Sequence, residues 1–387
     1  MDHRILPLVR AIRLLARAWP APRTYRCPTA RALGVYAAQD LRAPRDVPAR
    51  AASGCDGFLV RADAAAGTYR VAGAHSPSSP PLVTPGEGLA WRVEKGTPLP
   101  EGTGLVPIAS ATLVGTATVQ LPAPAGEAIA NPGSMLAAGT RIVAKGQRIG
   151  PRALALLAAG GVQEVEAIDP PVVHLVAIGS ELLLPGAVDI DTRYIRDALG
   201  VLGISASIVD VVPDQDECIR ERVANALAGG CVVACGGTGS GLADRTVASF
   251  RPGGIRFAAE GIALCPGETA AIALARHGAC LFMPGDPQDV AALTHALLIP
   301  ALARRTAMRI GSWEEAPPAP LVKPWSGPPD KHLLLPATYM HGNIEIVATR
   351  GVGGLFAGEG YALLAPGERE RTRAVPTAVL TFGGPFV

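Results

Sequence analysis

A continuous apolar run at residues 172–178 is the feature that most constrains the fold of this chain. It reads Val-Val-His-Leu-Val-Ala-Ile and follows two prolines. Such runs are typical of parallel strands that are buried on both faces. The segments expected after it are a helix from about Thr192 to Leu202, a strand at Ile204–Val212, a helix from about Asp216 to Ala228 and a strand at Cys231–Cys235. This βαβαβ order predicts a doubly wound α/β domain with right-handed crossovers, spanning residues 171–308.

The sequence on both sides of that domain has a different pattern. Residues 51–125 hold short β segments divided by Pro and Gly, which predicts an inserted β-rich module. We assign residues 1–50 and 126–170 to a linker domain with short strands and a helical run at Ala30–Leu41. A C-terminal β domain is expected at 320–387, after a proline-rich stretch. The fold class expected is therefore multidomain α/β with β-rich additions.

The charge and cysteine content limit which molecules the chain is expected to bind and where it is expected to reside. Lys and Arg number 35 against 33 Asp and Glu, a net charge of +2, so we expect no nucleic-acid and no membrane surface. The seven cysteines form no C-x-x-C pair, which favours a reducing, cytoplasmic location over a disulfide scaffold. An amphipathic first helix carries Arg10, Arg13 and Arg17 at helical spacing, and these charges interrupt any signal-peptide core.

Two loops follow strands of the predicted α/β sheet, where open sheets of this type bind their ligands. The first is 179–182, Gly-Ser-Glu-Leu, and the second is 236–241, Gly-Gly-Thr-Gly-Ser-Gly. Glycines let backbone N–H groups approach an anion closely, so phosphate or pterin binding is expected at the second loop. A plain strand–helix turn is the alternative, and the Lys of a nucleotide P-loop is missing.

Two carboxylates accompany these loops. Glu181 lies in the first, and Asp244 lies just after the second, at the head of the next helix. If their strands are neighbours, both side chains could bind a hard cation such as Mg²⁺. The structural alternatives are a helix N-cap for Asp244 and a solvated loop charge for Glu181.

Six stretches, taken in order, resemble the molybdopterin molybdenumtransferases, the family of MoeA and the gephyrin E domain, along nearly the whole chain. Residues 32–48 are similar to the family's entry helix and strand, and 53–61, Ser-Gly-Cys-Asp-Gly-Phe-Leu-Val-Arg, resembles its S-A-M-D-G-Y-A-V-R segment. The third stretch is 85–100, with Pro-Gly-Glu and Thr-Pro-Leu-Pro, and the fourth is 178–182, which is similar to T-G-D-E-L. The fifth is the glycine loop at 236–244. The sixth joins 265–267 and 283–287, which are similar to K-P-G-K-P and L-P-G-N-P.

The resemblance implies a homodimer whose active site lies between the α/β domain of one subunit and the inserted module of the other. The implied reaction inserts molybdate into adenylylated molybdopterin, releases AMP and uses Mg²⁺. A molybdoenzyme or a molybdopterin-adenylylating protein would be a further partner. The implied catalytic residues are Asp56, Glu181, Asp244 and Lys95, with Glu181 and Asp244 as metal ligands. The implied cofactor-binding residues are Gly179, Ser180, Gly236, Gly237, Thr238, Gly239, Ser240, Pro266, Gly267, Pro284 and Gly285.

Several positions depart from the family pattern. Lys95 stands where the family has Thr, Gln215 takes the place of a second carboxylate, and Ser180 replaces the Asp of T-G-D-E-L. Cys265 and Thr269 replace the first Lys and the last Pro of K-P-G-K-P. We therefore expect a more positive pocket with weaker metal-assisted chemistry. Three hypotheses remain: a molybdenumtransferase, a non-catalytic carrier of molybdopterin or its cofactor, and a CinA-like hydrolase that shares only the α/β domain.

Overall fold

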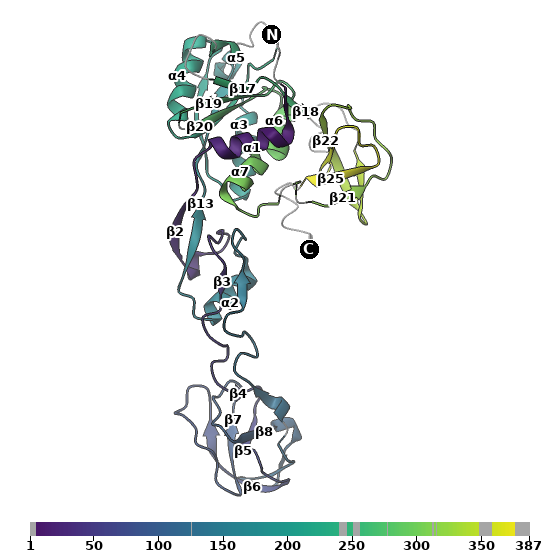
Figure 1. Cartoon of the computed structure of the whole chain (residues 1–387). Coiled ribbons are helices and arrows are strands. Elements are labelled where there is room, and N and C mark those ends of the chain that lie inside the picture. The colour runs from purple at the N-terminus through teal and green to yellow at the C-terminus, as the bar shows by residue number, and fades with distance from the viewer. Residues whose placement is uncertain are drawn as a thin grey trace.

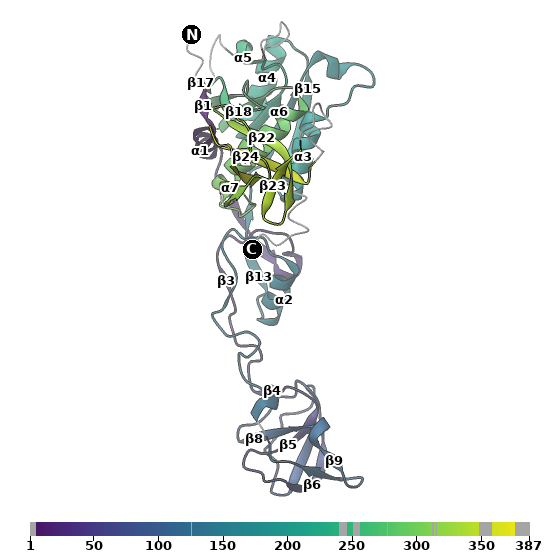
Figure 2. The ribbon, with the colours of Figure 1, turned by 90° about the vertical axis from the view of Figure 1, so that its right-hand side faces the viewer.

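The computed structural model describes residues 5–124, 126–239, 246–250, 256–276, 278–311, 313–314, 316–347 and 358–375. The molecule is elongated (Figures 1 and 2). The α/β domain and the C-terminal β sheet lie at one end, and a separate β module lies at the other. A narrow set of paired strands connects the two ends.

The α/β domain is built on a six-stranded sheet in the order β15-β14-β16-β20-β19-β17. The first four strands in that order are parallel, and β19 pairs antiparallel with both of its neighbours, β20 and β17. The bounds are β14 Val173–Ile178, β15 Ala206–Val212, β16 Cys231–Cys235, β17 Arg256–Ala259, β19 Ala271–Ala275 and β20 Gly278–Met283. This arrangement confirms the predicted α/β fold class.

Side chains of these strands alternate between two cores, one on each face of the sheet. Leu175 and Val233 belong to the core that α1, α3, α6 and α7 cover, while Val176 and Val232 belong to the core that α4 covers. The helices are α1 Leu8–Ala18, α3 Asp191–Val201, α4 Asp216–Leu227, α5 Thr246–Ser249, α6 Pro287–Leu293, a π-helical turn Thr294–Leu298 and α7 Ile299–Thr306. Burial on both faces explains why the central strands are continuously apolar.

Helix α1 belongs physically to the α/β domain, although the sequence placed residues 1–50 with the linker. Its Leu8, Ile12 and Leu15 are fully buried in the first of these cores, and the helix contacts α7. Arg10, Arg13 and Arg17 lie on the opposite, exposed face. The helix is therefore amphipathic as expected, and its apolar face determines where it docks.

The linker is made of strand pairs in which the chain runs out and back. β2 (Arg23–Pro28) pairs with β13 (Glu164–Asp169), β3 (Leu41–Arg42) with β12 (Arg141–Val143), and β4 (Ala52–Ser53) with β11 (Ile129–Ala130). Helix α2 spans Pro151–Ala159. The helical run expected at Ala30–Leu41 is wrong, because only a 3₁₀ turn at Thr29–Arg31 forms. Gly34, at φ +81°, takes a left-handed conformation three residues further on, which a continued right-handed helix would not contain.

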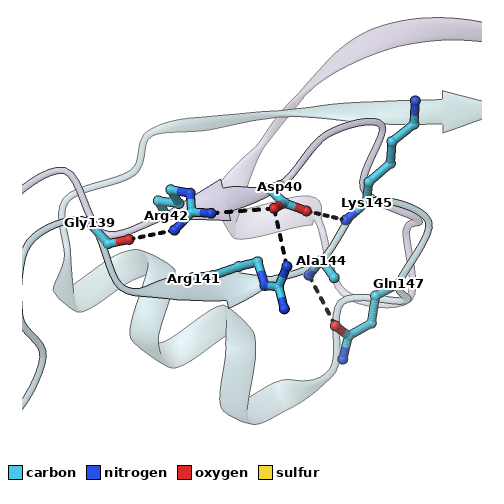
Figure 3. Close-up of polar contacts among 7 residues, drawn as sticks. All are labelled: Asp40, Arg42, Gly139, Arg141, Ala144, Lys145 and Gln147. Atoms are coloured by element: carbon cyan, nitrogen blue, oxygen red, sulfur yellow. Dashed lines mark hydrogen bonds and ion pairs between the residues drawn. The ribbon is translucent and has the colours of Figure 1, made fainter.

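Asp40 ties β3 and β12 together at the middle of the linker (Figure 3). Its carboxylate accepts a 2.9 Å hydrogen bond from the backbone N–H of Lys145 and lies 3.4 Å from Arg141 and 3.6 Å from Arg42. Arg42 also donates to the carbonyl of Gly139. The Lys145 hydrogen bond, assisted by the two guanidinium groups, holds the pKa of Asp40 below its usual value.

The inserted module is a six-stranded sheet in the order β8-β5-β7-β6-β10-β9. Its strands are β5 Gly57–Arg61, β6 Gly67–His75, β7 Leu89–Val93, β8 Thr103–Pro107, β9 Thr112–Leu113 and β10 Thr118–Leu121. Phe58, Val60 and Val106 are among the buried residues of its own small core. The module therefore has a core separate from that of the α/β domain.

The C-terminal sheet is not built from the C-terminal sequence alone. Its strand order is β1-β18-β22-β24-β25-β21, with β23 paired to β22. The bounds are β1 Leu6–Pro7, β18 Ile262–Cys265, β21 Pro318–Pro320, β22 His332–Met340, β23 Asn343–Ile346, β24 Gly360–Leu364 and β25 Arg371–Val375. Two strands from earlier in the chain thus anchor this sheet to the α/β domain. Within the described ranges, no helix has the length and apolarity to cross a membrane.

Candidate functional site

A cavity of about 490 Å³ opens at the carboxyl ends of β14, β16 and β20. The loops that follow these strands, at 179–182, 236–239 and 284–287, contribute to its lining, together with the start of α3. The chain passes from β14 outward to β15 and then returns to β16 on the other side. The cavity therefore lies at the point where strand order reverses, the usual ligand site of such sheets.

The glycine loop after β16 is shaped by contacts that only glycine permits. Gly236 has φ +114°, and a Cβ on it would lie 1.9 Å from the carbonyl oxygen of Ile178. Gly237 has φ +64°, and its Cβ would lie 2.5 Å from the Thr246 hydroxyl oxygen. That hydroxyl donates to the Gly236 carbonyl at 2.8 Å. The loop is thus pressed against β14 and closed by Thr246, which leaves its backbone at the cavity wall.

The first loop is tied to the end of β15 by a reciprocal pair of hydrogen bonds. The backbone N–H of Ser180 donates to the Asp214 carboxylate at 2.7 Å, and the backbone N–H of Asp214 donates to the Ser180 hydroxyl at 3.0 Å. Ser180 is one of the departures from the family's T-G-D-E-L pattern. Its hydroxyl therefore serves to fix the loop that carries Glu181.

The described lining is strongly acidic, so the more positive pocket expected from the sequence is not formed by the α/β domain of one chain alone. Among the described residues of the lining, none is Lys or Arg. Asp286 stands where the resembling motif L-P-G-N-P has Asn, so carboxylates lost elsewhere are replaced here. Within the part of the chain that the structure describes, six carboxylates line the cavity: Glu181, Asp189, Asp191, Asp214, Asp286 and Asp289.

Two of these carboxylates hold a proton more tightly than usual. Burial, with repulsion from Asp189, Asp286 and Asp289, raises the pKa of Asp191 to about 6. Burial and repulsion from Asp286 raise the pKa of Asp289 to about 6 as well. Asp191 also has a buried Oδ1 without a hydrogen-bond partner. The cavity therefore stores unfavourable negative charge that a bound cation or donor would relieve.

This charge predicts a stability that rises on mild acidification. A carboxyl whose folded pKa exceeds its unfolded value destabilises the fold most above the folded pKa, and the penalty declines as pH falls from about 6 toward the unfolded value of 3.8. We expect Asp191→Asn to raise the free energy of unfolding by about 1–2 kcal/mol at pH 7.5 and by less than half as much near pH 4.5. Chemical unfolding at both pH values measures this. Asp197→Asn, on the exposed part of α3, is the matched control, and an equal gain there would contradict the argument.

The sequence-predicted residues fall into separate groups. The cavity lining includes Gly179, Glu181, Gly236, Gly237, Gly239, Pro284 and Gly285. Ser180 and Thr238 support it from behind, the latter through a 3.5 Å contact between its hydroxyl and that of Thr269, which lines the cavity. Pro266 and Gly267 do not line it, although the Gly267 backbone hydrogen-bonds to Asp289. Ser240 and Asp244 lie outside the described residues.

Asp56 directly precedes β5 and Lys95 follows the end of β7, so both belong to the β module, which lies at the far end of the molecule from the α/β domain (Figure 1). They are neighbours, because the backbone N–H of Lys95 donates to the Asp56 carboxylate at 2.7 Å. One chain therefore brings these two residues together but does not bring them to the cavity.

Sequence reasoning missed most of the acidic lining. Asp189, Asp191, Asp286 and Asp289 flank or begin helices that start at the carboxyl edge of the sheet. Asp286, for example, caps α6 by accepting from the backbone N–H of Gln288 at 2.8 Å. The available signal was the position of each aspartate at the helix start after a buried strand, but acidic residues there are equally typical of caps.

The donor chemistry fits a divalent cation that is shared with a ligand. Among the described residues, no three His, Cys, Asp or Glu side chains are arranged to hold a metal ion by themselves. Mg²⁺, however, is commonly bound by one or two carboxylates together with substrate phosphates and waters. The unpartnered Oδ1 of Asp191 and the exposed carboxylate of Glu181 offer that kind of ligand.

Two protein families match separate parts of the chain. Residues 6–161 match the MoeA N-terminal region (domain I and II), and residues 174–304 match the probable molybdopterin binding domain. A molybdopterin molybdenumtransferase of Synechococcus elongatus is 29% identical over 299 residues, which are 71% of this chain and 74% of that protein. Molybdopterin molybdenumtransferase 2 of Mycobacterium tuberculosis is 30% identical over 190 residues, 45% of each chain. A crystal structure of a molybdopterin biosynthesis MoeA protein from Pyrococcus horikosii shares the fold, with a TM-score of 0.79 at 24% identity, covering 96% of this chain and 98% of that one.

Proposed function

Because the chain belongs to the MoeA family of molybdenum cofactor biosynthesis, we propose that it inserts molybdate into adenylylated molybdopterin and releases AMP. The observation that carries the proposal is the 490 Å³ cavity at the carboxyl ends of β14, β16 and β20. It lies within the region that matches the molybdopterin binding domain. Its volume suits a ligand of drug-like size that is held from several sides.

Different residues that form the cavity would bind the phosphate, hold the cation and exchange protons. The backbone of the loop at 236–239 would bind the anionic phosphate of the substrate, since its glycines leave N–H groups accessible. The hydroxyls of Thr238 and Thr269 would add neutral donors beside it. Glu181 and Asp191 would hold Mg²⁺ against the substrate, where the cation supplies neutralisation of the charge on the phosphate oxygens. Asp191 and Asp289 would also exchange protons near neutral pH, given their raised pKa values.

The direct test uses the purified full-length chain with adenylylated molybdopterin, molybdate and Mg²⁺. Release of AMP that depends on both molybdate and Mg²⁺ would support the transferase. Tight binding of the pterin without any AMP release would instead support the carrier hypothesis. AMP release that is independent of molybdate would contradict both and would favour hydrolysis.

We also propose that the active unit is a homodimer in which the β module of one subunit completes the cavity of the other. The proposal rests on the distance between the ends of the molecule, since the Asp56–Lys95 pair cannot serve the cavity of its own chain in this arrangement (Figure 1). A second copy related by two-fold symmetry would supply two equivalent shared sites.

Complementation between two inactive variants tests this shared site. Asp56→Asn and Glu181→Gln are each expected to be inactive alone, because each damages both sites of its own dimer. A mixed dimer of the two variants would contain one site with no substitution. After subunit exchange of an equimolar mixture, about a quarter of wild-type AMP release should return, because half the dimers are mixed and half their sites are intact. No recovery despite demonstrated exchange would exclude the shared site.

A further inference from the structure

A second cavity, of about 220 Å³, lies at the C-terminal sheet on the side that packs against the α/β domain. It has no part in the proposed transferase site. The residues of its lining that carry the argument are Trp313, His332, Ala365, Glu368, Arg371 and Arg373. Its volume is below the range of sites for drug-sized ligands, so a molecule of one ring fits it better than a pterin nucleotide.

Strand register explains why a gap exists there. Leu334, Leu363 and Arg373 lie opposite one another in β22, β24 and β25, so their side chains share one face of the sheet. The next row on the same face consists of His332, Ala365 and Arg371. Each of them lies two residues along the chain from a member of the first row, and side chains two residues apart point to the same face. Because the middle member is small, a depression forms between an imidazole and a guanidinium group.

His332 presents an acceptor in this depression. Burial lowers the pKa of His332 below its usual value, so the ring is neutral at physiological pH, and a hydrogen bond to the backbone of Ala263 opposes that shift only in part. Nδ1 is buried and has no hydrogen-bond partner. A buried acceptor left unpaired costs about 1–3 kcal/mol, which a ligand carrying an O–H or N–H donor would recover.

The opposite side of the depression is cationic. Arg373 donates to the carbonyls of Glu314 and Ala316 and so fixes the segment that carries Trp313. Arg371 is exposed, and within the described part of the chain no carboxylate lies in ion-pair distance of its guanidinium. The nearby Glu368 accepts hydrogen bonds from the backbone N–H groups of Glu370 and Arg369, and these bonds, with a smaller contribution from the charge of Arg371, hold the pKa of Glu368 below its usual value. Arg371 is therefore available to an anionic ligand.

An aromatic wall completes the site. Trp313 is 5% exposed, and its indole N–H donates to the Ala296 carbonyl at 2.9 Å, which fixes the ring. Its ring centroid lies 5.8 Å from that of His332. A flat ligand can therefore contact a rigid indole while its two ends reach the acceptor and the cation.

We propose that this cavity binds a small aromatic monoanion that carries a carboxylate at one end and a hydroxyl donor at the other. The carboxylate pairs with Arg371, the hydroxyl donates to Nδ1 of His332, and the ring lies over Ala365 against Trp313. Strands β22 and β25 are separated by β24, so the two anchoring residues are about 10 Å apart at the backbone, a span that para substituents on one ring match.

The test uses 4-hydroxybenzoate as the probe, with the full-length protein and titration calorimetry. Benzoate lacks the donor and 4-hydroxybenzamide lacks the charge, so each should bind about 5- to 10-fold more weakly than the probe. Equal affinity for all three compounds would mean that ring burial alone drives binding and would overturn the proposal. Absence of binding at millimolar concentration would overturn it as well.

Three variants locate the binding. Ala365→Leu fills the depression and should abolish binding, while His332→Phe should remove only the preference for the probe over benzoate. Arg371→Gln should remove the preference over 4-hydroxybenzamide. Circular dichroism and the unfolding midpoint identify any variant that fails to fold, and His332→Phe and Arg371→Gln test the two ends independently. An unchanged preference in both folded variants would place the probe elsewhere.

Discussion

Glu181→Gln is expected to slow AMP release by about 10²-fold or more, the scale on which one electrostatic contact in an active site acts. The side chain follows β14 in a loop that Asp214 holds in place, and it lines the cavity without being buried. The substitution keeps the size and the hydrogen-bonding capacity of the side chain but removes its charge. The charge is what a cation beside a phosphate requires, so the chemical step should suffer more than binding.

Steady-state AMP release and separate pterin titration measure the two effects. Glu221→Gln, on the exposed face of α4, removes the same charge outside the cavity and is the matched control. Pterin affinity should stay within a fewfold of wild type, because one carboxylate beside an anion contributes little to attraction. If AMP release is insensitive to Glu181→Gln, Glu181 is not part of the catalytic site.

Gly236→Ala is expected to destabilise the α/β domain by about 3 kcal/mol or more, which is a large share of the stability of a typical domain. The new methyl group would lie 1.9 Å from the carbonyl oxygen of Ile178, and φ +114° is a conformation that alanine rarely adopts. Neither partner can yield, since Ile178 is the last residue of β14 in the centre of the sheet. Chemical unfolding and the yield of folded protein measure the loss.

Gly285→Ala is the control for that substitution. Its Cβ would lie 3.4 Å from the Cα of Gly236, so it places a methyl group beside the same loop at an ordinary contact distance. The control should fold and should reveal whether a methyl group at the cavity wall alters pterin binding. An unchanged stability for Gly236→Ala would mean that the loop can move away from β14.

The structure also changes how a Gly237→Val experiment would be interpreted. From the sequence, this substitution should abolish pterin binding without unfolding the protein, because a side chain blocks approach to the phosphate. In the structure the Cβ would also meet the Thr246 hydroxyl, which itself holds the Gly236 carbonyl. Loss of binding in that variant would therefore mix blocked approach with a displaced loop.

The α/β fold could be predicted from the sequence because a strand that is buried on both faces of a sheet is apolar at nearly every position, a pattern visible within a few residues. The apolar run of β14 and the two helices that follow it predict neighbouring parallel strands without knowledge of anything distant. Strand β1 gives no such signal. It has two residues, and it pairs with β18, which lies more than 250 positions later, so only the docked position of α1 brings it there.

The candidate site was partly accessible for the same reason. The glycine loop and Glu181 follow strands that are evident in the sequence, and the structure brings both to one cavity. The acidic lining was not accessible, because its charge depends on which helix starts converge. Asp191 and Asp289 are about 100 positions apart, and their mutual repulsion exists only after α3 and α6 pack at the same edge of the sheet.

The strand pairs of the linker have a mechanical consequence. The chain reaches the β module along β2, β3 and β4 and returns along β13, β12 and β11, so two covalent strands cross every level of the connection. A linker of one chain segment would let the module rotate freely about it, whereas a hydrogen-bonded two-stranded ribbon resists torsion and bends mainly across its flat face. Bending therefore moves Asp56 along an arc, while rotation of the module about the long axis of the linker is resisted, so fewer orientations must be sampled before Asp56 meets a partner's cavity.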